Sequence, residues 1–132
     1  MDKNEWKEIL VLDHMINSKC RLLSQLKQKQ SFVKSLQSNT DRVQSSPKNC
    51  QEEVIVRILD LELDITRDID CLIDKKWKAK KEIDRLSGIH KVVMSMRYLE
   101  CMRWEKIAHQ LHYSIQAVYK IHGQALIRLK ND

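Results

Sequence analysis

Apolar residues recur at alternating spacings of three and four along the first helix that the sequence predicts, over about residues 3–37. The eight seam positions read Ile9, Leu12, Ile16, Lys19, Leu23, Leu26, Gln30 and Val33. Because six of these eight are apolar, the pattern favours a long amphipathic helix with a coiled-coil-like seam. Lys19 and Gln30 interrupt the seam, and we expect them to fix its register.

A second seam predicts another long helix over about residues 51–86. Its positions are Ile55, Ile58, Glu62, Ile65, Ile69, Leu72, Lys76, Ala79, Ile83 and Leu86. Between the two helices, a loop is expected at about residues 38–50, where the only proline, Pro47, disfavours helical dihedrals at Ser46.

Neither seam is stable in water alone, so we expect residues 1–86 to form one domain, an antiparallel helical hairpin. The same seams could instead pair between two chains, which would give a homodimer through the hairpin. The spacing of the apolar residues fits both arrangements equally, so the sequence leaves this choice open.

A second domain is expected over residues 87–132, after a helix stop and restart at Ser87 and Gly88. It ends in the stretch WEKIAHQLHYSIQAVYKI, residues 104–121, which reads as two short helices with a break at residues 112–114. The expected fold class is all-α, a long antiparallel helical hairpin followed by a C-terminal helix-turn-helix unit.

The helix-turn-helix prediction depends on which residues of these two helices are buried. Ala108 is the small residue at the crossing of the helices, and Ser114 is suited to cap the second one. The remaining positions expected to be buried are Ile107, Leu111, Val118, Ile121, Ala125, Leu126 and Leu129. A small residue, a turn, a cap and then a β-branched pair three apart is typical of the motif.

Burial of Val118 and Ile121 turns Gln116, Tyr119 and Lys120 outward near the start of the second helix, where side chains reach base edges. Gln116 can pair with adenine, and Lys120 can donate to guanine or phosphate. Tyr119 offers its hydroxyl to a phosphate or its ring to a thymine methyl group. Further contacts with double-stranded DNA are expected from Ser114 with its neighbouring amides, Arg103, Lys106 and Arg128.

The charge distribution agrees with a polyanionic partner. The formal net charge is +6, and residues 88–132 contribute +4 of it, with seven basic and three acidic side chains. A second basic segment at residues 75–85 places five lysines around Trp77. These lysines could contact the DNA backbone, but a solvated helix face is the preferred interpretation.

Other chemistry finds little support in the sequence. The four cysteines are far apart and form no CxxC pair, so neither a zinc site nor a disulfide framework is expected. We expect no metal, cofactor or catalytic site, and therefore no enzyme. The charged N-terminus and the absence of a long apolar run predict a cytoplasmic protein with no membrane contact.

The stretch RYLECMRWEKIAHQLHYSIQAVYKIHGQALIRL, residues 97–129, resembles region 4 of bacterial sigma-70-type factors. With the loop DRVQSSP, residues 41–47, it is similar to small phage and prophage proteins of the ArpU/RinA type from low-GC Gram-positive bacteria. The resemblance implies a phage transcriptional regulator that acts in the cytoplasm of a bacterial host cell. The alternative is a module that docks on RNA polymerase or another regulator without sequence-specific DNA binding.

The chain departs from the sigma pattern at two turn positions. Cys101 and His112 stand where the pattern has glycine. A left-handed non-glycine residue costs about 1–2 kcal/mol, so we expect these turns to be strained or differently shaped.

Overall fold

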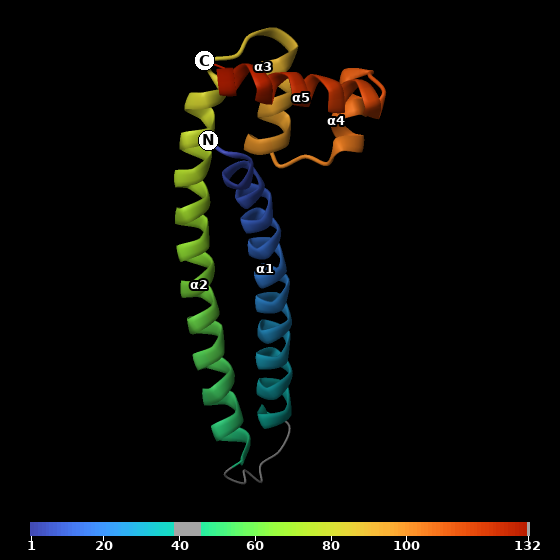
Figure 1. Cartoon of the computed structure of the whole chain (residues 1–132). Helices are drawn as coiled ribbons and strands as arrows, with labels where there is room; N and C mark the ends of the chain where they lie inside the picture. The colour runs from blue at the N-terminus through green and yellow to red at the C-terminus, as the bar shows by residue number, and fades with distance from the viewer. Residues whose placement is uncertain (39–45, 132) are drawn as a thin grey trace. The chain divides into compact units, whose positions relative to one another are not determined.

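The protein is all-α, as predicted. The computed structural model describes residues 1–38 and 46–131, and side chains within 1–36 and 51–131. These residues form five α-helices and one π-helical turn, with no strand among them (Figure 1). The elements are α1 (Lys3–Ser38), α2 (Ser46–Ile83), α3 (Gly88–Met94), the π-helical turn η1 (Ser95–Leu99), α4 (Trp104–Leu111) and α5 (Ile115–Asn131).

The start of α2 differs from the prediction. It begins at Ser46, five residues before the expected start, and includes Pro47 in its first turn. Proline is tolerated there because the first amides of a helix have no intrahelical acceptor. The remaining part of the predicted loop, residues 39–45, lies outside the described residues.

By their internal contacts, the residues group into two units. One comprises residues 14–70, and the other combines residues 1–13 with residues 71–132. The predicted domain boundary after residue 86 was placed at the end of a predicted helix, whereas the two observed units are defined by contacts between residues. The first turns of α1 therefore belong with the C-terminal helices.

In the unit of residues 14–70, α1 and α2 pair within one chain and run antiparallel (Figure 1). Lys19 lies in the seam as predicted, and its ammonium binds the carboxylates of Asp68 at 2.6 Å and Asp64 at 3.0 Å. These two hydrogen-bonded carboxylates raise the pKa of Lys19. The charged seam position thus has partners on the facing helix, which specifies the register of the pair.

The second seam was predicted correctly only in part. Ile55 and Ile69 are 37% and 40% exposed, whereas Val54 is 1% exposed. Adjacent helical residues point about 100° apart, so a rotation of α2 about its axis exchanges one for the other. At Ile69 the cause is visible, because the neighbouring Asp68 faces α1 to accept a hydrogen bond from Lys19.

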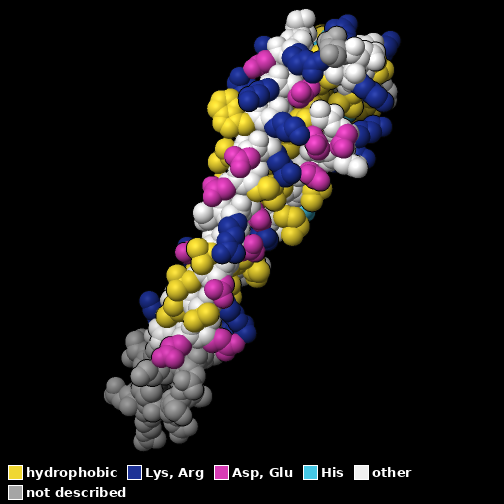
Figure 2. Space-filling view, turned by 60° about the vertical axis from the view of Figure 1, so that its left-hand side comes forward, with side chains coloured by type: hydrophobic (Ala, Val, Ile, Leu, Met, Phe, Trp, Pro, Cys, Tyr) yellow, Lys and Arg dark blue, Asp and Glu magenta, His cyan; other side chains and the backbone are white. Residues whose placement is uncertain are grey.

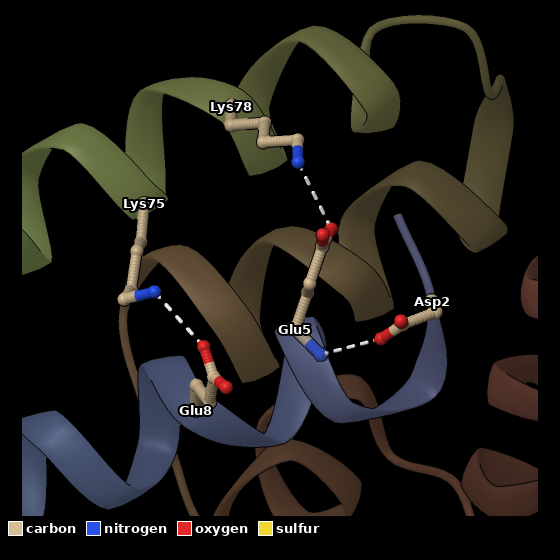
Figure 3. A network of polar contacts seen from close by, with 5 residues as sticks. All are labelled: Asp2, Glu5, Glu8, Lys75 and Lys78. Carbon is tan, nitrogen blue, oxygen red and sulfur yellow. Dashed lines mark hydrogen bonds and ion pairs between the residues drawn. The ribbon is translucent and has the colours of Figure 1, made fainter.

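The other unit begins with a network of polar contacts between α1 and the end of α2 (Figure 3). The Asp2 carboxylate accepts the Glu5 amide at 2.9 Å and so caps α1. Glu8 binds Lys75 at 2.9 Å, and Glu5 binds Lys78 at 3.1 Å. Each of these surface pairs contributes little to stability, but together they fix how the two helix ends align.

The lysines around Trp77 behave largely as the preferred interpretation expects. Lys75 and Lys78 bind carboxylates of α1, and Lys80 binds Asp84, the first residue after α2. Trp77 itself is 58% exposed. Figure 2 shows exposed hydrophobic side chains between charged ones along the visible face of the long helices.

The core of the C-terminal helices lies where α3, α4 and α5 meet. Its buried cluster consists of Val93, Met102, Ile107, Ala108 and Val118. The partly buried Leu111 and Ile121 pack against this cluster, so the apolar pattern of residues 107–121 predicted the core correctly.

The π-helical turn η1 interrupts the α-helical periodicity between α3 and α4. Tyr98 within η1 is buried, as is Met94 directly before it, whereas Val92 in α3 is 41% exposed. A π turn holds more residues than an α turn, so the residues after it are rotated away from the 3.6-residue pattern. Sequence periodicity alone does not reveal such a turn.

Candidate nucleic-acid interface

The turn between α4 and α5 is built by local hydrogen bonds. The Ser114 hydroxyl accepts the Ala117 amide at 3.1 Å, and the Ser114 carbonyl accepts the Val118 amide at 3.1 Å. Ser114 is therefore the N-cap of α5, as predicted, and its side chain is exposed. At the other side of the turn, the Tyr113 amide donates to the Ala108 carbonyl at 3.0 Å.

Both turn positions that depart from the sigma pattern adopt left-handed dihedrals. The φ angles are 55° at Cys101 and 59° at His112. His112 is the C-cap of α4, where a left-handed residue ends the helix. The turns therefore keep the backbone shape that glycine favours, and the two side chains impose a steric cost.

A His112→Gly variant should raise the free energy of unfolding by about 1 kcal/mol. Glycine removes the left-handed strain of about 1–2 kcal/mol, offset in part by its greater freedom in the unfolded chain. Urea denaturation followed by circular dichroism measures the change. The matched control is His109→Gly in α4, which should lose about 1 kcal/mol because His109 has helical dihedrals. If both variants lost the same unfolding free energy, the left-handed strain at His112 would be contradicted.

The side chains predicted to face a groove are exposed on the first two turns of α5. Gln116, Tyr119 and Lys120 are all exposed, while Val118 between them is fully buried. The orientation expected from the apolar pattern is therefore present. Tyr119 is only partly free, because its ring meets the Trp104 ring edge-on with centroids 5.3 Å apart.

The predicted basic residues do not all lie together. Arg103 and Lys106, at the start of α4, are exposed, and Trp104 between them contacts Tyr119 of α5. Arg128 lies twelve residues beyond Gln116, about 18 Å along the helix axis. Its guanidinium is 3.2 Å from the Nδ1 atom of His90 in α3, so its position is set by that helix.

The sequence did not predict a cluster of aromatic and imidazole rings that joins α5 to η1 and α4. The guanidinium of Arg97 stacks over Trp104 at 4.3 Å and donates to the Met102 carbonyl at 2.8 Å. His122 meets Trp104 edge-on, with centroids 4.7 Å apart, and its Nε2 atom is 2.8 Å from the Tyr98 hydroxyl. The only signal was the aromatic character of positions 98 and 104, which does not reveal partners.

Burial lowers the pKa of His122 to about 4, and the positive charges of Arg97 and Lys3 act in the same direction. Burial also raises the pKa of Tyr98. Both rings are therefore neutral at pH 7, and a neutral imidazole can accept the Tyr98 hydroxyl hydrogen at Nε2. This pair supports Trp104, which in turn contacts Tyr119 on the candidate interface.

Stability should fall as the pH is lowered from about 6.5 toward 4. In the unfolded chain His122 takes up a proton near its ordinary pKa, whereas the folded protein resists protonation until about pH 4. The contribution of neutral His122 to stability is complete above pH 6.5 and is lost progressively as the pH falls toward 4. Melting temperatures of the wild type and of His122→Gln across this range provide the test. If the melting temperature of the wild type falls no more than that of His122→Gln, the low pKa of His122 is contradicted.

Among the described residues, no group of three or more His, Cys, Asp or Glu side chains lies close enough to hold a metal ion. None of the described helices combines the length and apolar character that crossing a membrane requires.

Comparison with protein-family models matched most of the chain. The model of the family described as "Protein of unknown function (DUF1492)" matches residues 32–130. The searches of curated proteins and of solved structures found no match. Because the matched segment spans all of α2, α3 and α4 and all but the last residue of α5, it includes the core and the candidate interface. The chain belongs to the DUF1492 family.

Proposed function

We propose that this protein is a DNA-binding transcriptional regulator in which α4 and α5 act as a helix-turn-helix. The observation that carries the proposal is the burial pattern of α5. Val118 is fully buried, while Gln116, Tyr119 and Lys120 around it are exposed on the first two turns. A recognition helix presents such early side chains to the major groove.

The charge of the two helices supports the same proposal. Residues 103–131 carry five basic side chains and one acidic side chain, Glu105. Attraction to phosphates supplies most of the affinity of nonspecific DNA binding and a large share of specific binding. The helix pair therefore has both the charge to bind a duplex and polar side chains able to distinguish bases.

Each exposed residue has a separate role in the proposed complex. Gln116 would pair with adenine through its amide, and Lys120 would donate to guanine or to phosphate. Tyr119, held at its edge by Trp104, would offer its hydroxyl to the backbone. Arg103 and Lys106 at the start of α4 would bind phosphates and set the orientation of α5.

The resemblance to sigma region 4 and to small phage regulators supports a role in phage gene expression within a bacterial cell. Contact with RNA polymerase is part of this proposal. A module that binds polymerase without DNA is the alternative, and it predicts no affinity for any duplex.

Selection of bound duplexes from random DNA, followed by titration of the selected duplex, tests the proposal. About five neutralised phosphates predict a slope near −4 to −5 for log affinity against log salt concentration. Lys120→Glu should weaken binding by about 1–3 kcal/mol and make the slope shallower by about one. The control variant Lys29→Glu, which changes an exposed lysine of α1, should bind DNA nearly as the wild type does.

No enrichment of any duplex by the full chain would contradict the proposed function. Binding that Lys120→Glu leaves intact would show that DNA is bound elsewhere than on the first turns of α5.

A further inference from the structure

A mostly apolar groove lies in the unit formed by residues 1–13 and 71–132. Its volume is about 960 Å³, and it runs between the start of α1 and the second half of α5. The apolar and ring side chains that line it are those of Met1, Trp6, His122, Leu126, Ile127 and Leu129. None of these residues is among the proposed DNA contacts.

The groove exposes apolar surface that packing within the chain does not use. Ile127 is 61% exposed, and Leu126 and Leu129 beside it are only partly buried. A contiguous exposed apolar patch of this kind commonly marks a protein interaction site.

Gly123 adds an independent observation. It lies inside α5 and lines the groove, although glycine destabilises a helix interior relative to alanine. A Cβ atom at this position would meet none of the described residues within 4 Å, so no neighbour among them requires the glycine. The space above Gly123 can instead receive a side chain of a partner.

The charges at the groove indicate the chemistry of that partner. Lys3 and Lys130 line the groove, and within the described part of the chain neither forms an ion pair. The one carboxylate of the lining, that of Asp2, accepts the Glu5 amide at the start of α1. The groove therefore offers two free cations beside apolar walls.

We propose that this groove binds an amphipathic helix of a partner protein, with apolar residues inserted between α1 and α5 and acidic residues beside them. An amphipathic helix places apolar side chains three and four residues apart into such a groove. Its acidic residues would meet Lys3 and Lys130. The proposal is separate from the proposed DNA binding.

Calorimetric titration of the full chain with two synthetic helical peptides provides the test. Both peptides have about 15 residues, with leucines three and four apart. One carries glutamates beside the leucines, and the other carries lysines at the same positions. The acidic peptide should bind at least about tenfold more tightly, as two rim ion pairs allow.

Variants of the groove sharpen the test. The double variant Lys3→Glu/Lys130→Glu should reverse the preference between the two peptides. The charge-matched control Lys29→Glu/Lys34→Glu, in the unit of residues 14–70, should keep the wild-type preference. Gly123→Leu should fill the groove and weaken binding of the acidic peptide about tenfold, while its circular dichroism spectrum stays that of the wild type.

Failure of the wild type to bind either peptide, or equal binding of both, would overturn the proposal. An unchanged preference in the double variant would overturn it as well. Self-association of the chain that Ile127→Glu abolishes would identify a second copy as the occupant and would also overturn it. Because the duplex titration uses other residues, failure here leaves the proposed DNA binding unaffected.

Discussion

A Trp6→Ala variant should lose about 4 kcal/mol of unfolding free energy, the largest effect that we expect from a single substitution. Trp6 is 2% exposed, and its ring packs against Tyr98 with centroids 4.8 Å apart. Removal of the indole leaves a cavity between the first turns of α1 and the C-terminal helices. Urea denaturation followed by circular dichroism measures the loss.

The matched control is Trp77→Ala. Because Trp77 is 58% exposed, its loss removes far less buried area and should cost less than about 1 kcal/mol. Comparison of the two tryptophans separates the effect of burial from the effect of residue type.

Hydrogen exchange tests where the stability is lost. In Trp6→Ala, the amides of η1 should exchange faster together with those of residues 3–13, because both belong to the same unit. Loss of protection confined to residues 3–13, with η1 unchanged, would refute the contact between Trp6 and Tyr98 as a stabilising one.

An Ile107→Ala variant is expected to lose about 3 kcal/mol of unfolding free energy. Ile107 is fully buried in the cluster that joins α4 to α5, where three methylene or methyl groups would be removed at once. Ile127→Ala serves as its control, because Ile127 lies in α5 with a largely exposed side chain. The control should stay within about 0.5 kcal/mol of the wild type.

The Ile107 variant also bears on the proposed function. Since the cluster holds Val118 inward, its loosening should weaken DNA binding even though Ile107 itself faces no groove. A destabilised variant that binds the selected duplex as tightly as the wild type would mean that the orientation of α5 does not depend on this core.

The long helices and the core of residues 107–121 could be predicted because their signal is periodic and local. Apolar residues at spacings of three and four define a buried stripe whatever the partner is. Ser114 was predicted as a cap for a similar reason, since its hydroxyl reaches an amide only three residues away.

The candidate interface could be predicted only as far as burial determines it. The exposure of Gln116, Tyr119 and Lys120 followed from the inward position of Val118. The contact of Tyr119 with Trp104 and that of Arg128 with His90 could not be foreseen, because each joins two different helices. Helical spacing contains no information on which side chains of separate helices meet.

The sequence by itself determined that this protein is helical, where most of its helices begin and end, and which face of α5 is buried. Only the tertiary structure decided that the first turns of α1 pack with the C-terminal helices, that Val54 replaces Ile55 in the core, and that a groove opens beside Gly123. The physical reason is that helix formation depends on neighbours within about one turn. Which of two adjacent apolar residues is buried depends instead on shape and charge supplied by residues far away in the chain.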